Sequence, residues 1–125
     1  AVDILAPRGS AVVAVDDGTL ARLLNSPAGG ISVYQFDPAE RYYYFYAHLE
    51  RYVAGLVEGE AVKRGQTIAY VGTSGNAPPN TPHLHFAIAE VTTPKHWWGG
   101  RPINPYPLWR GALRKGTTLN GGWAR

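Results

Sequence analysis

The sequence predicts an all-β fold, a sandwich or barrel-like single domain. Short segments rich in β-branched and aromatic residues recur along the chain of 125 residues. Between them stand 15 glycines and 10 prolines, residue types that favour turns. One stretch, residues 19–24, resembles a helix, and it is short. Strands separated by turn signals at this spacing are typical of all-β sandwiches and barrels.

The first strand is predicted at residues 11–15, an apolar run that ends at the turn sequence Asp16-Asp17-Gly18. Residues 19–24 leave this turn and fit a strand as well as a short helix. The next strand, residues 31–36, lies between glycine- and proline-containing turns at 27–30 and 37–38.

Aromatic residues dominate the third predicted strand, residues 41–49. Residues 67–71 form the next one, after the turn at 63–65, and residues 84–91 the last, after the loop that contains Ser74-Gly75-Asn76. From His96 onward, tryptophans and prolines replace the strand pattern. We expect an irregular arm there, packed on the strands by Trp97, Trp98 and Trp109.

The length fits one hydrophobic core, and we expect a domain at 1–110 followed by a basic tail at 111–125. Residues 1–90 carry nine acidic and six basic residues, whereas residues 91–125 carry six basic residues and no acidic one. Because these bases are scattered among Gly, Pro and Trp, we expect a solvated tail and no nucleic-acid site. No apolar run reaches the roughly 20 residues of a membrane-spanning helix.

The chain has no cysteine, so a metal site would have to use His, Asp or Glu. Two of the four histidines, His83 and His85, stand one residue apart in a predicted strand. Residues two apart on a strand share a face, so both imidazoles point the same way, with Leu84 and Phe86 opposite. The pair fits a shared site or two polar residues on a solvated face.

Strict alternation along residues 41–49 places His48 on the face of Tyr42, Tyr44 and Tyr46. Such a histidine fits a base, a ligand or a ring that is hydrogen-bonded within an aromatic sheet, and the three tyrosines fit a groove floor or the core. Asp3 stands between Val2 and Ile4, where a carboxylate must form a salt bridge, for example to Arg8, or bind something. Zinc accepts both imidazole nitrogen and carboxylate oxygen.

Four segments, taken in order, resemble the lysostaphin-type (LytM-type) zinc endopeptidases that cut peptide bonds in bacterial peptidoglycan. They are VDILAPRGSAVVAVDDGTL, YYYFYAHLERY, GEAVKRGQTIAYVGTSGNA and PHLHFAI. The resemblance runs from Ala1 to about Pro107. It implies an antiparallel β-sandwich of the duplicated hybrid motif type with a groove across one sheet. It also implies Zn²⁺ as cofactor, a peptidoglycan peptide as substrate, and a periplasmic, cell-envelope or extracellular location.

By the same resemblance, Asp3 and His85 are metal ligands, while His48 and His83 are catalytic. The family's first ligand is a histidine four residues before its aspartate, and the chain begins two residues before Asp3. We therefore expect a further histidine ligand upstream of Ala1. Without it, we expect the 125-residue chain to bind zinc poorly and to show little or no activity.

Of two alternatives, only the first stays open. One is a catalytically inactive module of the same fold that binds the cell wall or activates an amidase. The other is a biotinyl or lipoyl carrier domain, because residues 59–68 resemble a hairpin of such carriers. A carrier needs a lysine at the tip of a second hairpin, and Lys63, Lys95 and Lys115 do not provide one.

Overall fold

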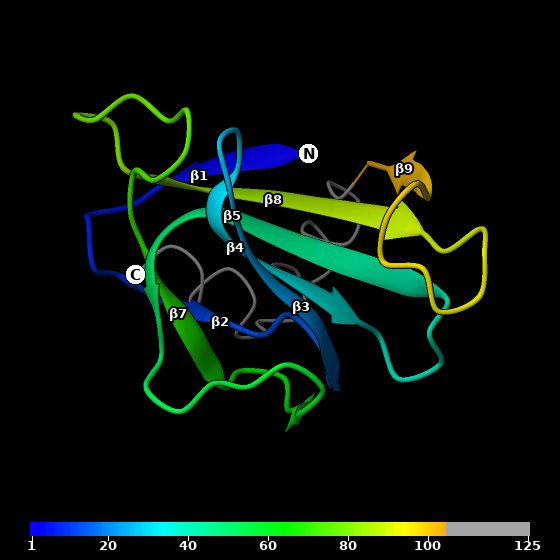
Figure 1. Cartoon of the computed structure of the whole chain (residues 1–125). Helices are drawn as coiled ribbons and strands as arrows, with labels where there is room; N and C mark the ends of the chain where they lie inside the picture. The colour runs from blue at the N-terminus through cyan, green and yellow to red at the C-terminus, as the bar shows by residue number, and fades with distance from the viewer. Residues whose placement is uncertain (105–125) are drawn as a thin grey trace, which may run out of the picture.

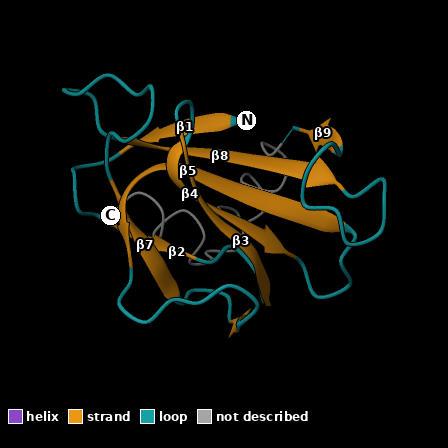
Figure 2. Ribbon diagram, viewed as in Figure 1, coloured by secondary structure: helices purple, strands orange, loops and turns teal. Residues whose placement is uncertain are grey.

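The computed structural model describes residues 1–104 of the chain and shows an all-β fold, which confirms the predicted class. No helix occurs among these residues (Figure 2), so none is long and apolar enough to span a membrane. The strands are β1 (Val2–Leu5), β2 (Ala11–Val13), β3 (Gly18–Ser26), β4 (Gly30–Phe36), β5 (Tyr42–Tyr52), β6 (Ala61–Val62), β7 (Thr67–Val71), β8 (His83–Glu90) and β9 (Arg101–Ile103).

All strand pairs are antiparallel, and the long strand β5 organises them (Figure 1). The main strand order is β1-β8-β5-β4-β3-β6, and β9 pairs with β8 on the same edge as β1, further along the strand. Residues 42–47 of β5 pair with β8, whereas residues 49–52 pair with β7, which in turn pairs with β2. The sheet therefore bends along β5 and encloses a core.

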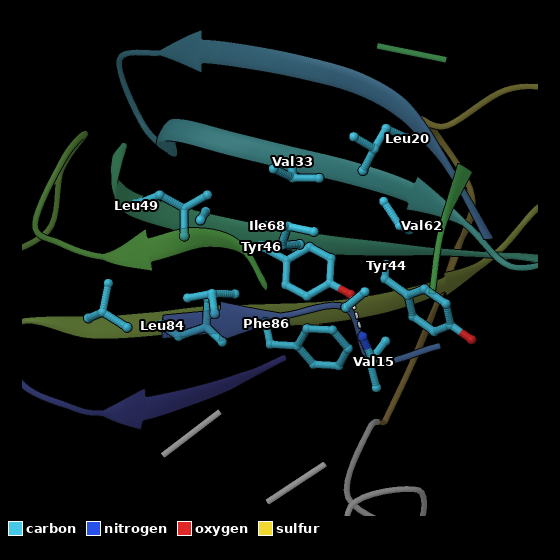
Figure 3. Packing of buried hydrophobic residues seen from close by; sticks show 14 of the residues in the cluster. Val15, Leu20, Val33, Tyr44, Tyr46, Leu49, Val62, Ile68, Leu84 and Phe86 are labelled. Atoms are coloured by element: carbon cyan, nitrogen blue, oxygen red, sulfur yellow. Dashed lines mark hydrogen bonds between the residues drawn. The ribbon is translucent and has the colours of Figure 1, made fainter. Parts of the chain in front are cut away.

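The core lies between the inner face of the main sheet and the β2–β7 pair (Figure 3). Tyr46, Leu49, Ile68, Leu84 and Phe86 are among its fully buried side chains. Each such side chain contributes about 1.5–3 kcal/mol when it leaves water. The cluster brings together strands far apart in the sequence, so it fixes their relative positions.

The strands expected at residues 11–15, 31–36, 41–49, 67–71 and 84–91 are all present; residues 67–71 have the expected ends, and the other four have shifted ends. The ambiguous stretch, residues 19–24, is part of strand β3. Three short strands, β1, β6 and β9, are not predicted by the sequence pattern, since each is defined by its pairing with a distant segment.

The arm beyond β8 is only partly irregular, because β9 pairs with β8. The Trp97 ring packs against Tyr34 of β4, with ring centroids 4.6 Å apart. Trp98 contacts Trp97 at 4.9 Å and remains 50% exposed. Trp109, the boundary expected at residue 110 and the tail at 111–125 lie outside the described residues.

Candidate active site

Strands β1 and β8 bring Asp3 and His85 together. Their Cα atoms are direct partners in the antiparallel ladder, so the side chains share one face. His85 Nδ1 lies 2.8 Å from Asp3 Oδ1. This is the outer face of the sheet, opposite the core, and it also carries Tyr34 and Phe45. Arg8, the salt-bridge partner considered for Asp3, instead pairs with Glu50 at 2.8 Å.

His83 stands beside this pair and is 8% exposed. Its Nδ1 atom lies 2.9 Å from the carbonyl oxygen of Thr81. A carbonyl oxygen can only accept a hydrogen bond, so Nδ1 carries the proton of the neutral ring. Nε2 is then the nitrogen with the free lone pair, and it lies 3.9 Å from Asp3 Oδ1.

His48 lies on this same outer face, so the assignment from strict alternation is wrong. Tyr46 pairs with Val33 and Leu49 pairs with Ile31, so three steps along β5 match two steps along β4. This β-bulge and the positive φ of His48, 59°, turn its side chain to the other side. The His48 ring centroid is 5.0 Å from that of His83 and 5.8 Å from that of His85.

The three tyrosines Tyr42, Tyr44 and Tyr46 of β5 precede this bulge, so they stay on the inner face and do not form a groove floor. Tyr44 and Tyr46 are buried in the core, and Tyr42 packs against it. Burial, reinforced by the nearby Asp16 carboxylate, raises the pKa of Tyr44 well above its usual range. On the outer face, Phe45 packs edge-on against His85 with ring centroids 6.1 Å apart.

His48 is held on three sides by the main chain. Its N–H donates to Gly29 O at 2.8 Å, and its carbonyl oxygen accepts from the Gly72 N–H at 3.1 Å. Its Nδ1 atom lies 2.8 Å from Ser74 O, so the proton of the neutral ring again sits on Nδ1. A left-handed backbone is costly for a residue with a side chain, and it persists where surrounding contacts impose it.

These groups line one hollow of about 460 Å³. It is bounded by Asp3, Leu5, His48, Asn76, Ala77, Pro78, Thr81, His83 and His85. Asn76, Ala77, Pro78 and Thr81, all in the loop between β7 and β8, form one wall. Leu5 was not singled out from the sequence, although alternation from Asp3 places it on the same face. Its side chain is 71% exposed and lies beside His83 in the ladder.

The chemistry of the donors fits a zinc ion. Asp3 Oδ1 and His85 Nδ1 face each other, and zinc binds carboxylate oxygen and imidazole nitrogen at about 2.0–2.2 Å. Two ligands of a tetrahedral site stand about 3.3 Å apart at these bond lengths, so the pair needs to open by about 0.5 Å. Among residues 1–104, no group of three or more His, Cys, Asp or Glu residues is arranged to hold a metal ion.

Comparisons with known proteins show which family the chain resembles. The model of peptidase family M23 matches residues 1–105. The L-Ala--D-Glu endopeptidase of Bacillus subtilis (strain 168) is 36% identical over 70 residues, which cover 52% of this chain and 20% of that protein. The matched part thus spans about a fifth of that relative's length.

Two solved structures have the same fold. The catalytic domain of the antimicrobial peptidase lysostaphin from Staphylococcus simulans is similar with a TM-score of 0.74 and 25% identity, over 86% of this chain and 76% of that chain. A zinc-containing peptidase from Vibrio cholerae is similar with a TM-score of 0.66 and 29% identity, over 81% of this chain and 27% of that chain.

Proposed function

The chain belongs to peptidase family M23, and from this premise we propose that it is a zinc-dependent endopeptidase that hydrolyses peptide bonds in bacterial peptidoglycan. The observation that carries the proposal is the convergence of Asp3, His48, His83 and His85 on one hollow. These residues come from three neighbouring strands, β1, β8 and β5.

Asp3 and His85 are the proposed metal ligands, together with a histidine upstream of Ala1. A zinc ion held there supplies Lewis-acid chemistry to the carbonyl group of the substrate. Asp3 supplies a negative charge, and His85 is oriented by its place in the β8 ladder, where Ala47 is its partner on β5. The edge contact of Phe45 with His85 further restricts rotation of the ring.

His48 and His83 are the proposed catalytic residues. In both rings the Nδ1–H group donates a hydrogen bond to a main-chain carbonyl oxygen. Nε2 therefore has the lone pair and can accept a proton. One ring takes a proton from the attacking water and returns it to the amine nitrogen as the C–N bond breaks. The other accepts a hydrogen bond from the O–H of the attacking water through Nε2 and so orients the water.

The relatives support the substrate class and the location. An L-Ala--D-Glu endopeptidase and the antimicrobial peptidase lysostaphin are similar to this chain. We therefore propose a peptide of the bacterial cell wall as substrate and the cell envelope or its exterior as the location. Leu5, Ala77 and Pro78 give the hollow an apolar side against which a substrate residue can pack.

Substitution of the histidines tests the proposal. A His-Gly extension before Ala1 places a histidine four positions before Asp3, and purified peptidoglycan is then digested in the presence of zinc. We expect His48→Ala and His83→Ala to abolish release of soluble peptides while zinc content is retained, because neither residue is assigned as a ligand. His85→Ala is expected to lose zinc as well.

His96→Ala is the matched control, since His96 stacks on Trp98 outside the hollow and should be dispensable. Loss of zinc from His48→Ala or His83→Ala would reassign that residue as a ligand. Binding of peptidoglycan with no hydrolysis by the extended, zinc-loaded chain would favour the inactive cell-wall module instead.

A further inference from the structure

We propose that Ser74 is a positioning residue that fixes the ring orientation and tautomer of His48. The inference rests on the proposed function, in which His48 is catalytic. Ser74 lies in the loop between β7 and β8, and its role is carried by two different groups. Its carbonyl oxygen accepts a hydrogen bond from the His48 ring. Its hydroxyl group forms hydrogen bonds with the neighbouring strands and so holds that carbonyl in place.

The hydroxyl group of Ser74 joins three segments. It donates a hydrogen bond to Leu49 O at 2.6 Å, directly after the bulge that contains His48. It accepts one from the Ile31 N–H at 3.0 Å, at the start of β4. The loop, β4 and β5 are thus held together by one side chain, next to the residue whose ring must be oriented.

The backbone around Ser74 is packed closely against the turn before β4. A Cβ atom on Gly30 would lie 2.4 Å from the backbone of Ser74 and Gly75, and one on Gly75 would lie 2.4 Å from Gly30 N. Asn76 N–H also donates to Ala28 O at 2.9 Å. The loop therefore approaches β4 more closely than side chains would permit, and the Ser74 hydroxyl satisfies polar groups at this contact.

This arrangement determines which nitrogen of His48 is basic. The bond from Nδ1 to Ser74 O, 2.8 Å long, keeps the proton on Nδ1 and leaves the lone pair on Nε2. The partner of a histidine's second nitrogen commonly sets its tautomer in this way. If the hydroxyl group is removed, the Leu49 carbonyl and the Ile31 N–H lose a partner, the loop shifts, and the ring is released.

Nitrogen-15 NMR of the imidazole rings tests this in the metal-free, 125-residue chain at about pH 8.5, where an ordinary histidine is neutral. We expect the wild-type chain and Ser74→Thr to show His48 as a single Nδ1–H tautomer. In Ser74→Ala we expect a mixture of the two tautomers. Thermal melting followed by circular dichroism shows whether each variant is folded.

Kinetics on the zinc-loaded chain with the His-Gly extension supply the second measurement. We expect Ser74→Ala to lower kcat by about 10-fold to 100-fold, as for other residues that orient a functional group, with KM little changed. Ser74→Thr should restore most of kcat. Ser10→Ala is the matched control, because the Ser10 hydroxyl also donates to a carbonyl oxygen, Pro7 O at 2.6 Å, but contacts no histidine.

The outcomes separate the two proposals. A wild-type His48 with its proton on Nε2 would overturn the inference even if Ser74→Ala did not fold. So would an unchanged tautomer and kcat in a folded Ser74→Ala variant of an active chain. Absence of hydrolysis by the extended wild-type chain would instead overturn the proposed function, while the NMR result would still decide whether Ser74 sets the tautomer of His48.

Discussion

The hydroxyl group of Tyr46 is the centre of the polar contacts inside the core. It accepts a hydrogen bond from the Val15 N–H at 3.0 Å and donates one to Gln35 Oε1 at 2.7 Å. Burial raises the pKa of Tyr46 far above its usual range, and the Val15 N–H opposes this only in part. The neutral phenol is therefore part of the folded state.

Stability should consequently fall at alkaline pH. The pKa of Tyr46 is raised on folding, so its contribution is fully present below about pH 10, the ordinary tyrosine pKa, and is lost as the pH rises toward the folded pKa. In Tyr46→Phe we expect a shallower decrease above about pH 10. At neutral pH the variant should be less stable by about 1–3 kcal/mol, because Val15 N–H and Gln35 Oε1 lose their partner.

Urea unfolding of both proteins between about pH 7 and pH 11 measures these differences. A residual decrease is expected in the variant, since burial also raises the pKa values of Tyr44, Tyr52 and Tyr34. Parallel curves for the two proteins above about pH 10 would contradict the assignment to Tyr46.

At the level of single residues, regular strand alternation predicted the relative orientation of two candidate site residues and failed for a third. His83 and His85 share a face because regular strands alternate, and that prediction is confirmed by the ladder register. The side of the sheet that His48 occupies was predicted wrongly. Its bulge depends on contacts with Gly29, Gly72 and Ser74, which are not sequence neighbours of β5.

Among the elements, the longer strands were predictable and the short ones were not. Residues 67–71 and 84–91 show the apolar and β-branched pattern that strands require. Strands β6 and β9 have two and three residues and exist through pairing with β3 and β8. A segment of two or three residues is too short to show a periodic pattern. Whether it forms a strand depends on the partner strand with which it pairs.

The segment between β8 and β9 docks on the sheet mainly through Trp97. Its ring packs on Tyr34 and lies 5.9 Å from the guanidinium carbon of Arg22. We expect Trp97→Ala to lower the free energy of unfolding by about 1–2 kcal/mol, since a half-buried aromatic ring and its ring pair are lost.

Trp98→Ala is the comparison, because this side chain is 50% exposed and should contribute less than half as much. Guanidinium unfolding followed by circular dichroism ranks the two variants without relying on tryptophan fluorescence. Equal effects, or a larger one for Trp98→Ala, would show that Trp97 does not dock the segment.

In the molecule as a whole, the core and the candidate site occupy opposite faces of the same sheet. Tyr46, Phe86 and Leu84 face the core. Their neighbours Phe45, His85 and His83 lie on the outer face, where the two histidines line the hollow. Within residues 1–104, the core cluster contains no His, Cys, Asp or Glu side chain, so its burial does not depend on an ion. The chain should therefore fold without zinc and present Asp3 and His85 in their places beforehand.

Zinc binding should then depend on the number of ligands that this prearranged face supplies. A catalytic zinc site usually has three protein ligands and one open position. Asp3 and His85 provide two, so we expect weak binding by the 125-residue chain and by a chain with an Ala-Gly extension before Ala1. A His-Gly extension, which completes the His-x-x-x-Asp spacing, should increase zinc affinity by more than about 100-fold, because a lost ligand costs more than a lost partner of a ligand.

Calorimetric titration of the three chains with zinc measures this, and thermal unfolding provides an independent check. A ligand that binds only the folded state stabilises it by about 2.7 kcal/mol at a concentration of 100 Kd. At one zinc concentration, the His-Gly chain should therefore melt at a clearly higher temperature than the Ala-Gly chain, and Asp3→Ala should remove the difference. Equal zinc affinity in the His-Gly and Ala-Gly chains would show that the ligand set proposed for this face is wrong.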